Sequence, residues 1–380
     1  MENNTELRPY RIEFPQTDLD DLVERLGRTR WPDELPGVGW EYGVPAGWLK
    51  EVAEHWRTAY DWRVHEARLN EFPQYVTEID GTEVHFLHVT SPEPDALPLV
   101  LTHGWPGSVV EFLDMIGPLT DPRSYGGDPA DAFHVVLPSV PGYALSGPTR
   151  ETGWDRSRIA RAWIELMGRL GYGGRWGAHG GDVGSLVGRE LGVQHPEGLI
   201  GTHVTQIFAF PSGDPEEFAK LTEEDHQRLA VTAKFRTRNG YQAIQSTRPQ
   251  TLAYGLTDSP AGQLAWNAEL FNGFGDVVDS IDRDAFLTNV TLYWLTGTAG
   301  SAARVYFEDA RSEAWEKEEQ NTVPTGVAVF PNDFRSIRTF AERANNIVHW
   351  SEFEEGGHFA AMETPELLTQ DIRAFFRRLR

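Results

Sequence analysis

Short apolar runs alternate with helical patterns along much of this chain, and this alternation limits its possible folds more than any other feature. The runs resemble buried strands, and the segments between them carry apolar residues at helical spacing. The runs are residues 99–101, 134–137 and 175–178, and the helical patterns between them are 109–116 and 159–170. Strands that alternate with helices predict a mostly parallel, doubly wound sheet with helices on both faces.

The ends of this α/β pattern divide the chain into four expected segments. Residues 1–74 should form a helical segment that packs on the core, with helices at 17–31 and 45–60. The first part of the core, 75–207, should open with an antiparallel hairpin, because Asp80-Gly81 lies between the strand-like runs 75–79 and 84–89. The alternation then stops after a strand at 200–205.

Helical patterns rich in polar and aromatic residues follow, and they predict a lid inserted into the core over residues 208–298. The second part of the core, 299–380, should add strands at 326–330 and 347–353. It should end in an amphipathic helix over 365–379, which has proline at its first position.

The segment Gly177-Ala-His-Gly-Gly-Asp-Val-Gly-Ser185 joins the third strand of this series to a helix that runs to about His195. Gly180, Asp182 and Gly184 have the spacing of a nucleophile elbow, in which glycines let the neighbouring backbones approach closely. A carboxylate at the start of a helix is stabilised as an anion and can attack an electrophilic carbon to form an ester. Two alternatives remain at this point: Asp182 caps the helix, or the glycines form a dinucleotide-binding loop.

Other segments complete a catalytic pattern around Asp182. His103-Gly-Trp-Pro-Gly-Ser108 follows the first strand of the parallel series, where a loop can donate a backbone N–H to an oxyanion. The expected donors are Trp105 and Val183, although such a sequence can also be a simple turn.

Near the C-terminus, His358 lies in a glycine-flanked loop between the last predicted strand and the last helix. Asp333 follows the strand at 326–330, so the order along the chain is nucleophile, acid, histidine. Asp333 can orient His358 and stabilise its imidazolium. Glu354 and Glu355 are alternatives for the acid, but they are very close to the histidine along the chain.

Composition excludes several other classes of protein. The chain has no cysteine, which removes disulfides, zinc–thiolate clusters and a thiol nucleophile. It has neither a signal peptide nor a long apolar run, so we expect a cytoplasmic protein without a membrane anchor. The formal net charge of -23 disfavours nucleic acid as a partner. Only four of the 34 basic residues are lysine, which suggests a bacterium with a GC-rich genome.

Taken together, these motifs resemble those of the microsomal-type epoxide hydrolases, a family that includes the juvenile-hormone epoxide hydrolases, over nearly the whole chain. The motifs are Arg30-Trp31-Pro32, the 103–108 segment, the Gly-Gly-Asp elbow, and Gly356-Gly-His-Phe-Ala-Ala with Glu363-Thr-Pro-Glu. The resemblance implies an α/β-hydrolase fold. The sequence differs from the family pattern in two respects. Val183 stands where relatives often carry tryptophan, and the membrane anchor of the mammalian members is missing.

The resemblance also implies a mechanism and a substrate. Tyr241 and Tyr306 in the lid would hold the epoxide oxygen while Asp182 attacks a ring carbon. Water activated by His358 and Asp333 would then release a diol, with no metal or organic cofactor. A small apolar epoxide is implied, either aryl or vinyl, in the manner of relatives that act on natural-product intermediates such as those of enediyne antibiotics. Base rates favour a homodimer.

Three other functions remain as alternatives. A haloalkane dehalogenase would share the aspartate and histidine but would need halide-binding N–H groups instead of two phenols. A non-catalytic binding protein on the same fold would have no use for the set Asp182, Asp333 and His358. A serine esterase would need Ser185 or Ser108, and neither serine occupies the central elbow position.

Overall fold

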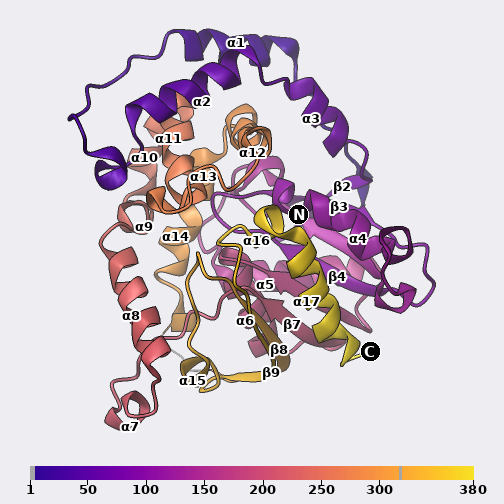
Figure 1. The fold of residues 1–380 in the computed structure, drawn as a ribbon. Helices are drawn as coiled ribbons and strands as arrows, with labels where there is room; N and C mark the ends of the chain where they lie inside the picture. Colours follow the sequence, from indigo (N-terminus) through magenta and orange to yellow (C-terminus); the bar gives the residue numbers. More distant parts are fainter. Residues whose placement is uncertain (1–4, 316–318) are drawn as a thin grey trace.

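A nine-stranded sheet lies at the centre of the computed structural model, which describes residues 5–315 and 319–380 (Figure 1). Its strand order is β1-β2-β3-β5-β4-β6-β7-β8-β9. The strands are β1 Arg8–Pro9, β2 Gln74–Ile79, β3 Thr82–Val89, β4 Leu97–Thr102, β5 Phe133–Pro138, β6 Trp176–Gly180, β7 Leu199–Val204, β8 Asn321–Val329 and β9 Asn345–Glu352.

The sheet changes from antiparallel to parallel along its width. Strands β1, β2, β3 and β5 pair antiparallel, and β5, β4, β6, β7, β8 and β9 pair parallel. The predicted hairpin is confirmed: Asp80 and Gly81 both have positive φ and join β2 to β3. Consequently, the loops that follow the parallel strands all emerge at one edge of the sheet.

Helices cover both faces of the sheet, so the predicted doubly wound arrangement is confirmed. On one face α5 Arg156–Arg169 packs beside α6 Val183–Gln194, and on the other α4 Leu113–Thr120 packs beside α17 Pro365–Arg377. Side chains of β4 alternate between the two cores: Val100 joins the first, while Leu99 and Leu101 join the second. This is the period of two that a strand buried on both faces requires.

The N-terminal segment arches over the lid at the top of Figure 1. Its helices are α1 Gln16–Gly27, α2 Ala46–Thr58 and α3 Trp62–Leu69, and α1 and α2 both contact a lid helix, α11 Pro260–Phe271. The prediction that the first helix extends to residue 31 is wrong, because the chain leaves helical geometry after Gly27. Pro32 disfavours a helical conformation in the residue that precedes it.

The inserted segment contains helices joined by loops, with no strand among its described residues, and it does not end where the sequence pattern suggested. Gly297 has φ 63° and closes α12, as a left-handed C-cap does. The short helices α13 Ala299–Ala302 and α14 Arg304–Asp309 and the 3-10 turn Glu313–Trp315 follow, and the next strand of the described residues begins at Asn321. The other helices of this segment are α7 Pro215–Phe218, α8 Glu223–Arg236, α9 Gly240–Gln245, α10 Pro249–Asp258, α11 and α12 Arg283–Thr296.

Two remaining short helices, α15 Arg338–Ala341 and α16 Ala360–Glu363, flank β9 and the loop that follows it. Within the described residues, we find no helix with the length and apolar character needed to cross a bilayer.

Candidate active site

The turn between β6 and α6 holds Asp182 in a strained conformation. Its φ of 52° and ψ of −116° are rare for a residue with a side chain, and strain of this kind concentrates at functional sites. Neighbouring backbones pack tightly here, since a Cβ on Gly180 would lie 2.4 Å from the backbone of Gly184. A Cβ on Gly184 would lie 2.0 Å from the carbonyl oxygen of Thr102. The aspartate makes no side-chain capping bond to α6, so helix capping does not explain it.

The carboxylate of Asp182 faces the loop that follows β4. The Trp105 N–H donates a hydrogen bond of 2.8 Å to its Oδ1. Burial raises the pKa of Asp182, while His358 and the N–H groups of Trp105 and Val183 oppose this rise by favouring the anion. The N–H groups of Trp105 and Val183, the two donors expected from the sequence, thus both favour the anionic form of this carboxyl.

His358 and Asp333 lie close together in the loops that follow the C-terminal ends of β9 and β8. A bridge between Asn332 and Gly357 holds their two loops together. His358 Nδ1 lies 2.7 Å from Asp333 Oδ1, and its Nε2 lies 3.8 Å from Asp182 Oδ2. Glu354 and Glu355, the alternatives for the acid, are exposed.

Two carboxylates control the charge of the His358 imidazole. Burial by itself would lower the pKa of His358, but Asp333 and Asp182 outweigh that effect and raise it to about 9. This pKa favours the protonated imidazole at neutral pH, and the ring lies between the carboxyl groups of Asp182 and Asp333.

Two tyrosines from the helical insertion complete the site. Tyr241 on α9 stacks on Trp105 with ring centroids 5.0 Å apart, and Tyr306 on α14 meets Trp105 edge-on at 5.7 Å. The two phenol rings lie 5.9 Å apart in a T-shaped contact. Burial, followed by the charge of Asp182, raises the pKa of Tyr241 well above its usual range, and the pKa of Tyr306 rises for the same reasons. Both phenols therefore keep their protons and can donate hydrogen bonds.

Gln206 is a residue that sequence reasoning missed. Its Oε1 accepts hydrogen bonds from the Asp182 N–H at 2.7 Å and from the Ser185 hydroxyl at 2.9 Å. Its Nε2 donates to Asp333 Oδ2, so one amide connects the elbow to the acid. The available signal was its position two residues after β7, at the same edge of the sheet.

The two serines weighed as nucleophiles have other partners. Ser185 Oγ donates to the Gly180 carbonyl at 2.9 Å and to Gln206, and it is buried in α6. Ser108 is also buried, and its Oγ accepts from the Val110 N–H at 3.3 Å. Both hydroxyls stabilise local backbone.

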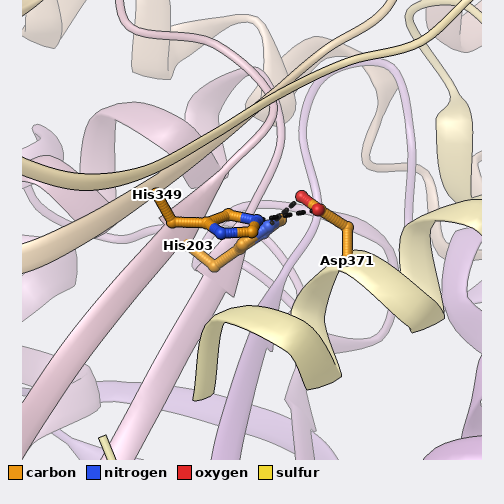
Figure 2. A group of neighbouring side chains, drawn as sticks. All are labelled: His203, His349 and Asp371. Carbon is orange, nitrogen blue, oxygen red and sulfur yellow. Dashed lines mark hydrogen bonds and ion pairs between the residues drawn. The ribbon is translucent and has the colours of Figure 1, made fainter. Parts of the chain in front are cut away.

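A second group of titratable side chains lies apart from this site. In Figure 2, Asp371 on α17 points toward the rings of His203 on β7 and His349 on β9. The Asp371 carboxylate lies 2.9 Å from His203 Nε2 and 2.8 Å from His349 Nε2, and it accepts from the Ser351 hydroxyl at 2.6 Å. These are the residue types that bind zinc. However, the ring nitrogens are already bonded to the carboxylate, so we describe the group as a hydrogen-bonded clamp.

Comparisons with known proteins return epoxide hydrolases. Residues 7–112 match the family model described as "Epoxide hydrolase N terminus". A relative from Stigmatella aurantiaca, itself assigned as an epoxide hydrolase, is 46% identical over 98% of this chain and 86% of its own length. Epoxide hydrolase 1 of Sus scrofa is 33% identical over 97% of this chain and 88% of its own.

A similar solved structure is also that of an epoxide hydrolase. The juvenile hormone epoxide hydrolase of Bombyx mori superposes with a TM-score of 0.91 at 30% identity, covering 100% of this chain and 96% of that one.

Proposed function

The chain belongs to the epoxide hydrolase family, and on that basis we propose that it converts an epoxide into a vicinal diol through a covalent ester on Asp182. The observation that carries the proposal is the position of the Asp182 carboxylate. It lies on a strained elbow, 3.8 Å from a histidine that is paired with Asp333, and its charge adds to the burial that raises the pKa of Tyr241 and Tyr306.

In the first stage, Asp182 attacks one carbon of the ring and the carbon–oxygen bond opens. Tyr241 and Tyr306 donate hydrogen bonds to the leaving oxygen, which needs a proton because a free alkoxide leaves poorly. The leaving oxygen takes a proton from one phenol, solvent returns a proton to that phenol, and the imidazolium of His358 releases one proton to solvent, so the protons taken up and released are equal in number. The product is a neutral glycol ester.

In the second stage, His358 acts as a base. Esterification removes the negative charge of Asp182, which had helped to raise the pKa of His358, so the imidazole binds its proton less tightly. Water then gives a proton to His358 and attacks the ester carbonyl. The oxyanion is stabilised by the N–H groups of Trp105 and Val183, and its collapse releases the diol and restores the Asp182 carboxylate.

The aromatic surroundings support an aryl or vinyl epoxide as the substrate. Trp105 lies against both phenols, and Phe274 stacks on Tyr241 with ring centroids 6.1 Å apart. Flat, polarisable groups pack well against such rings. A role in natural-product formation such as that of enediyne antibiotics stays a prediction, as do the homodimer and the cytoplasmic location.

The test is diol formation from racemic styrene oxide, measured by chiral chromatography for the parent protein and Asp182→Ala. We expect diol from the parent and a loss of at least about 10³-fold in the variant, because a covalent nucleophile has no substitute in the site. The exposed Asp114→Ala is the matched control and should keep full activity. Equal diol from Asp182→Ala and the parent would exclude Asp182 as the nucleophile.

A further inference from the structure

Glu111 is a buried carboxyl at the edge of the site that the steps above do not use. It lies in the single turn Val109–Phe112, directly after the loop that carries Trp105, and only 8% of its surface is exposed. Its side chain folds back onto that loop, since a Cβ on Gly107 would lie 1.3 Å from Glu111 Oε1. Glycine at position 107 therefore leaves the space that this carboxyl fills.

One oxygen of this carboxyl, Oε1, has no hydrogen-bond partner within the part of the chain that the structure describes, although the backbone of Gly104 helps to lower the pKa of the group. Glu111 Oε1 is buried without a hydrogen bond, and so are His358 Nε2, the Tyr143 hydroxyl and Asn289 Oδ1. An unsatisfied buried polar group destabilises the folded state, so natural proteins rarely leave one without a partner. Polar pockets of this kind hold ordered water, which makes two to four hydrogen bonds.

Two residues of α12 contact the loop that carries Trp105. Asn289 Nδ2 donates to the Pro106 carbonyl at 2.7 Å, and the Tyr293 hydroxyl donates to the Gly107 carbonyl at 2.7 Å. The rings of Tyr293 and Tyr143 lie 6.3 Å apart. The charges of His358 and Asp182 act on the pKa of Glu111, and Glu111 acts on the pKa of His358 and Tyr293, so the carboxyl lies within electrostatic range of these groups.

We propose that Glu111 is a further catalytic residue, whose Oε1 accepts a hydrogen bond from the water that hydrolyses the Asp182 ester. This inference rests on the proposed function. One O–H of the water is held by Glu111 while the other gives its proton to His358 Nε2. The water oxygen bonds to the ester carbonyl carbon, the ester carbon–oxygen bond breaks, and the released diol oxygen takes the second water proton. Asp182 is left as a carboxylate and His358 as an imidazolium, so atoms and charges balance.

A neutral Glu111 can accept a hydrogen bond from water without acting as a second nucleophile beside Asp182. Burial raises the pKa of Glu111 to about 8, with His358 opposing the rise and Asp182 adding to it. The carboxyl is thus largely neutral at pH 7, and its unprotonated oxygen can accept from water. Glutamine keeps that oxygen and the neutral charge, whereas methionine keeps the length and removes the acceptor.

The experiment follows one turnover of styrene oxide by rapid quenching and intact-protein mass spectrometry, which resolves formation of the ester from its decay. In Glu111→Met the ester should form at a rate within about threefold of the parent's and decay about 10- to 100-fold more slowly, as expected when a reactant is misplaced. Glu111→Gln should restore decay to within about fivefold. If Glu111→Met does not fold, Glu111→Asp serves instead, because its shorter side chain moves the acceptor oxygen away from the water. In this variant too, ester decay should slow while ester formation should not.

Two controls separate this inference from the proposed function. His358→Gln should accumulate the ester, and if it does not, the covalent mechanism fails and the role of Glu111 falls with it. Glu66→Gln changes an equally buried carboxyl, bonded to Phe14, Trp62 and Arg63, and should leave both rates unchanged. The inference is overturned if the ester accumulates in His358→Gln but decays at the parent rate in both Glu111→Met and Glu111→Asp. A Glu111→Met protein in which formation and decay slow equally also overturns it.

Discussion

The pKa of His358 depends on two carboxylates that lie close to its ring only in the folded chain. Asp333 bonds to Nδ1 at 2.7 Å, and Asp182 lies across Nε2 at 3.8 Å. In the unfolded chain neither carboxylate is near, and the pKa of the imidazole returns toward 6.5. The protonation of this residue is therefore linked to folding.

This linkage predicts how stability depends on pH. The folded pKa of His358, about 9, lies above the unfolded value of 6.5, so its stabilising contribution is complete below pH 6.5 and is lost as pH rises through 9. Urea unfolding should show the parent losing more stability than His358→Gln between pH 6.5 and 9.5. Parallel curves for the two proteins would contradict the assigned pKa shift.

At the scale of elements, the site depends on how closely α6 approaches β4. Asp182 projects from the junction of β6 and α6 while Trp105 follows β4, and these strands are hydrogen-bonded neighbours. Gly184 in the first turn of α6 lies against the backbone of Thr102 at the end of β4. A backbone contact cannot be relieved by rotating a side chain, so the distance between Asp182 and the Trp105 N–H depends on this glycine.

Gly184→Ala should therefore damage both stability and activity. Its methyl group would begin 2.0 Å from the Thr102 carbonyl oxygen, and such overpacking costs about 1–3 kcal/mol. The displaced elbow should lower kcat/KM by about 10²-fold. Gly168→Ala in α5 is the matched control: nothing lies within 4 Å of its added carbon, and it should be neutral or slightly stabilising. Thermal unfolding and diol formation measure both effects, and equal behaviour of the two variants would refute the argument.

At the scale of the whole molecule, the last helix is attached to the sheet by more than apolar packing. Phe375 and Phe376 of α17 are fully buried, and Gly326 and Gly177 make room for them in the strands. Asp371 adds a buried carboxylate that bonds to β7 and β9, and its pKa is lowered by these bonds although burial alone would raise it. The clamp thus joins the C-terminal helix to the half of the sheet that carries Asp333 and His358.

Removing this carboxylate should destabilise the protein without removing a reacting group. We expect Asp371→Ala to lower the free energy of unfolding by about 3–5 kcal/mol, the cost of breaking a buried, paired charge. Glu366→Ala, on the exposed side of the same helix, should change it by less than about 0.5 kcal/mol. Urea unfolding compares the two, and a loss of less than about 1 kcal/mol in Asp371→Ala would show that apolar packing alone anchors α17.

The sequence by itself determined the strands, most of the helices and the order of the chain through the sheet, because these follow from local periodicity and turn chemistry. It also placed Asp182, Asp333 and His358 in loops after strands, and parallel strands bring such loops to one edge. Only the tertiary structure decided which lid side chains face that edge, because Tyr241 and Tyr306 arrive on short helices whose packing no local pattern encodes.

The same holds for Gln206, which meets a carboxylate 127 residues away, and for Glu111, whose carboxyl fills a space left by Gly107. Contacts between distant segments depend on shapes that exist only after the layers have packed.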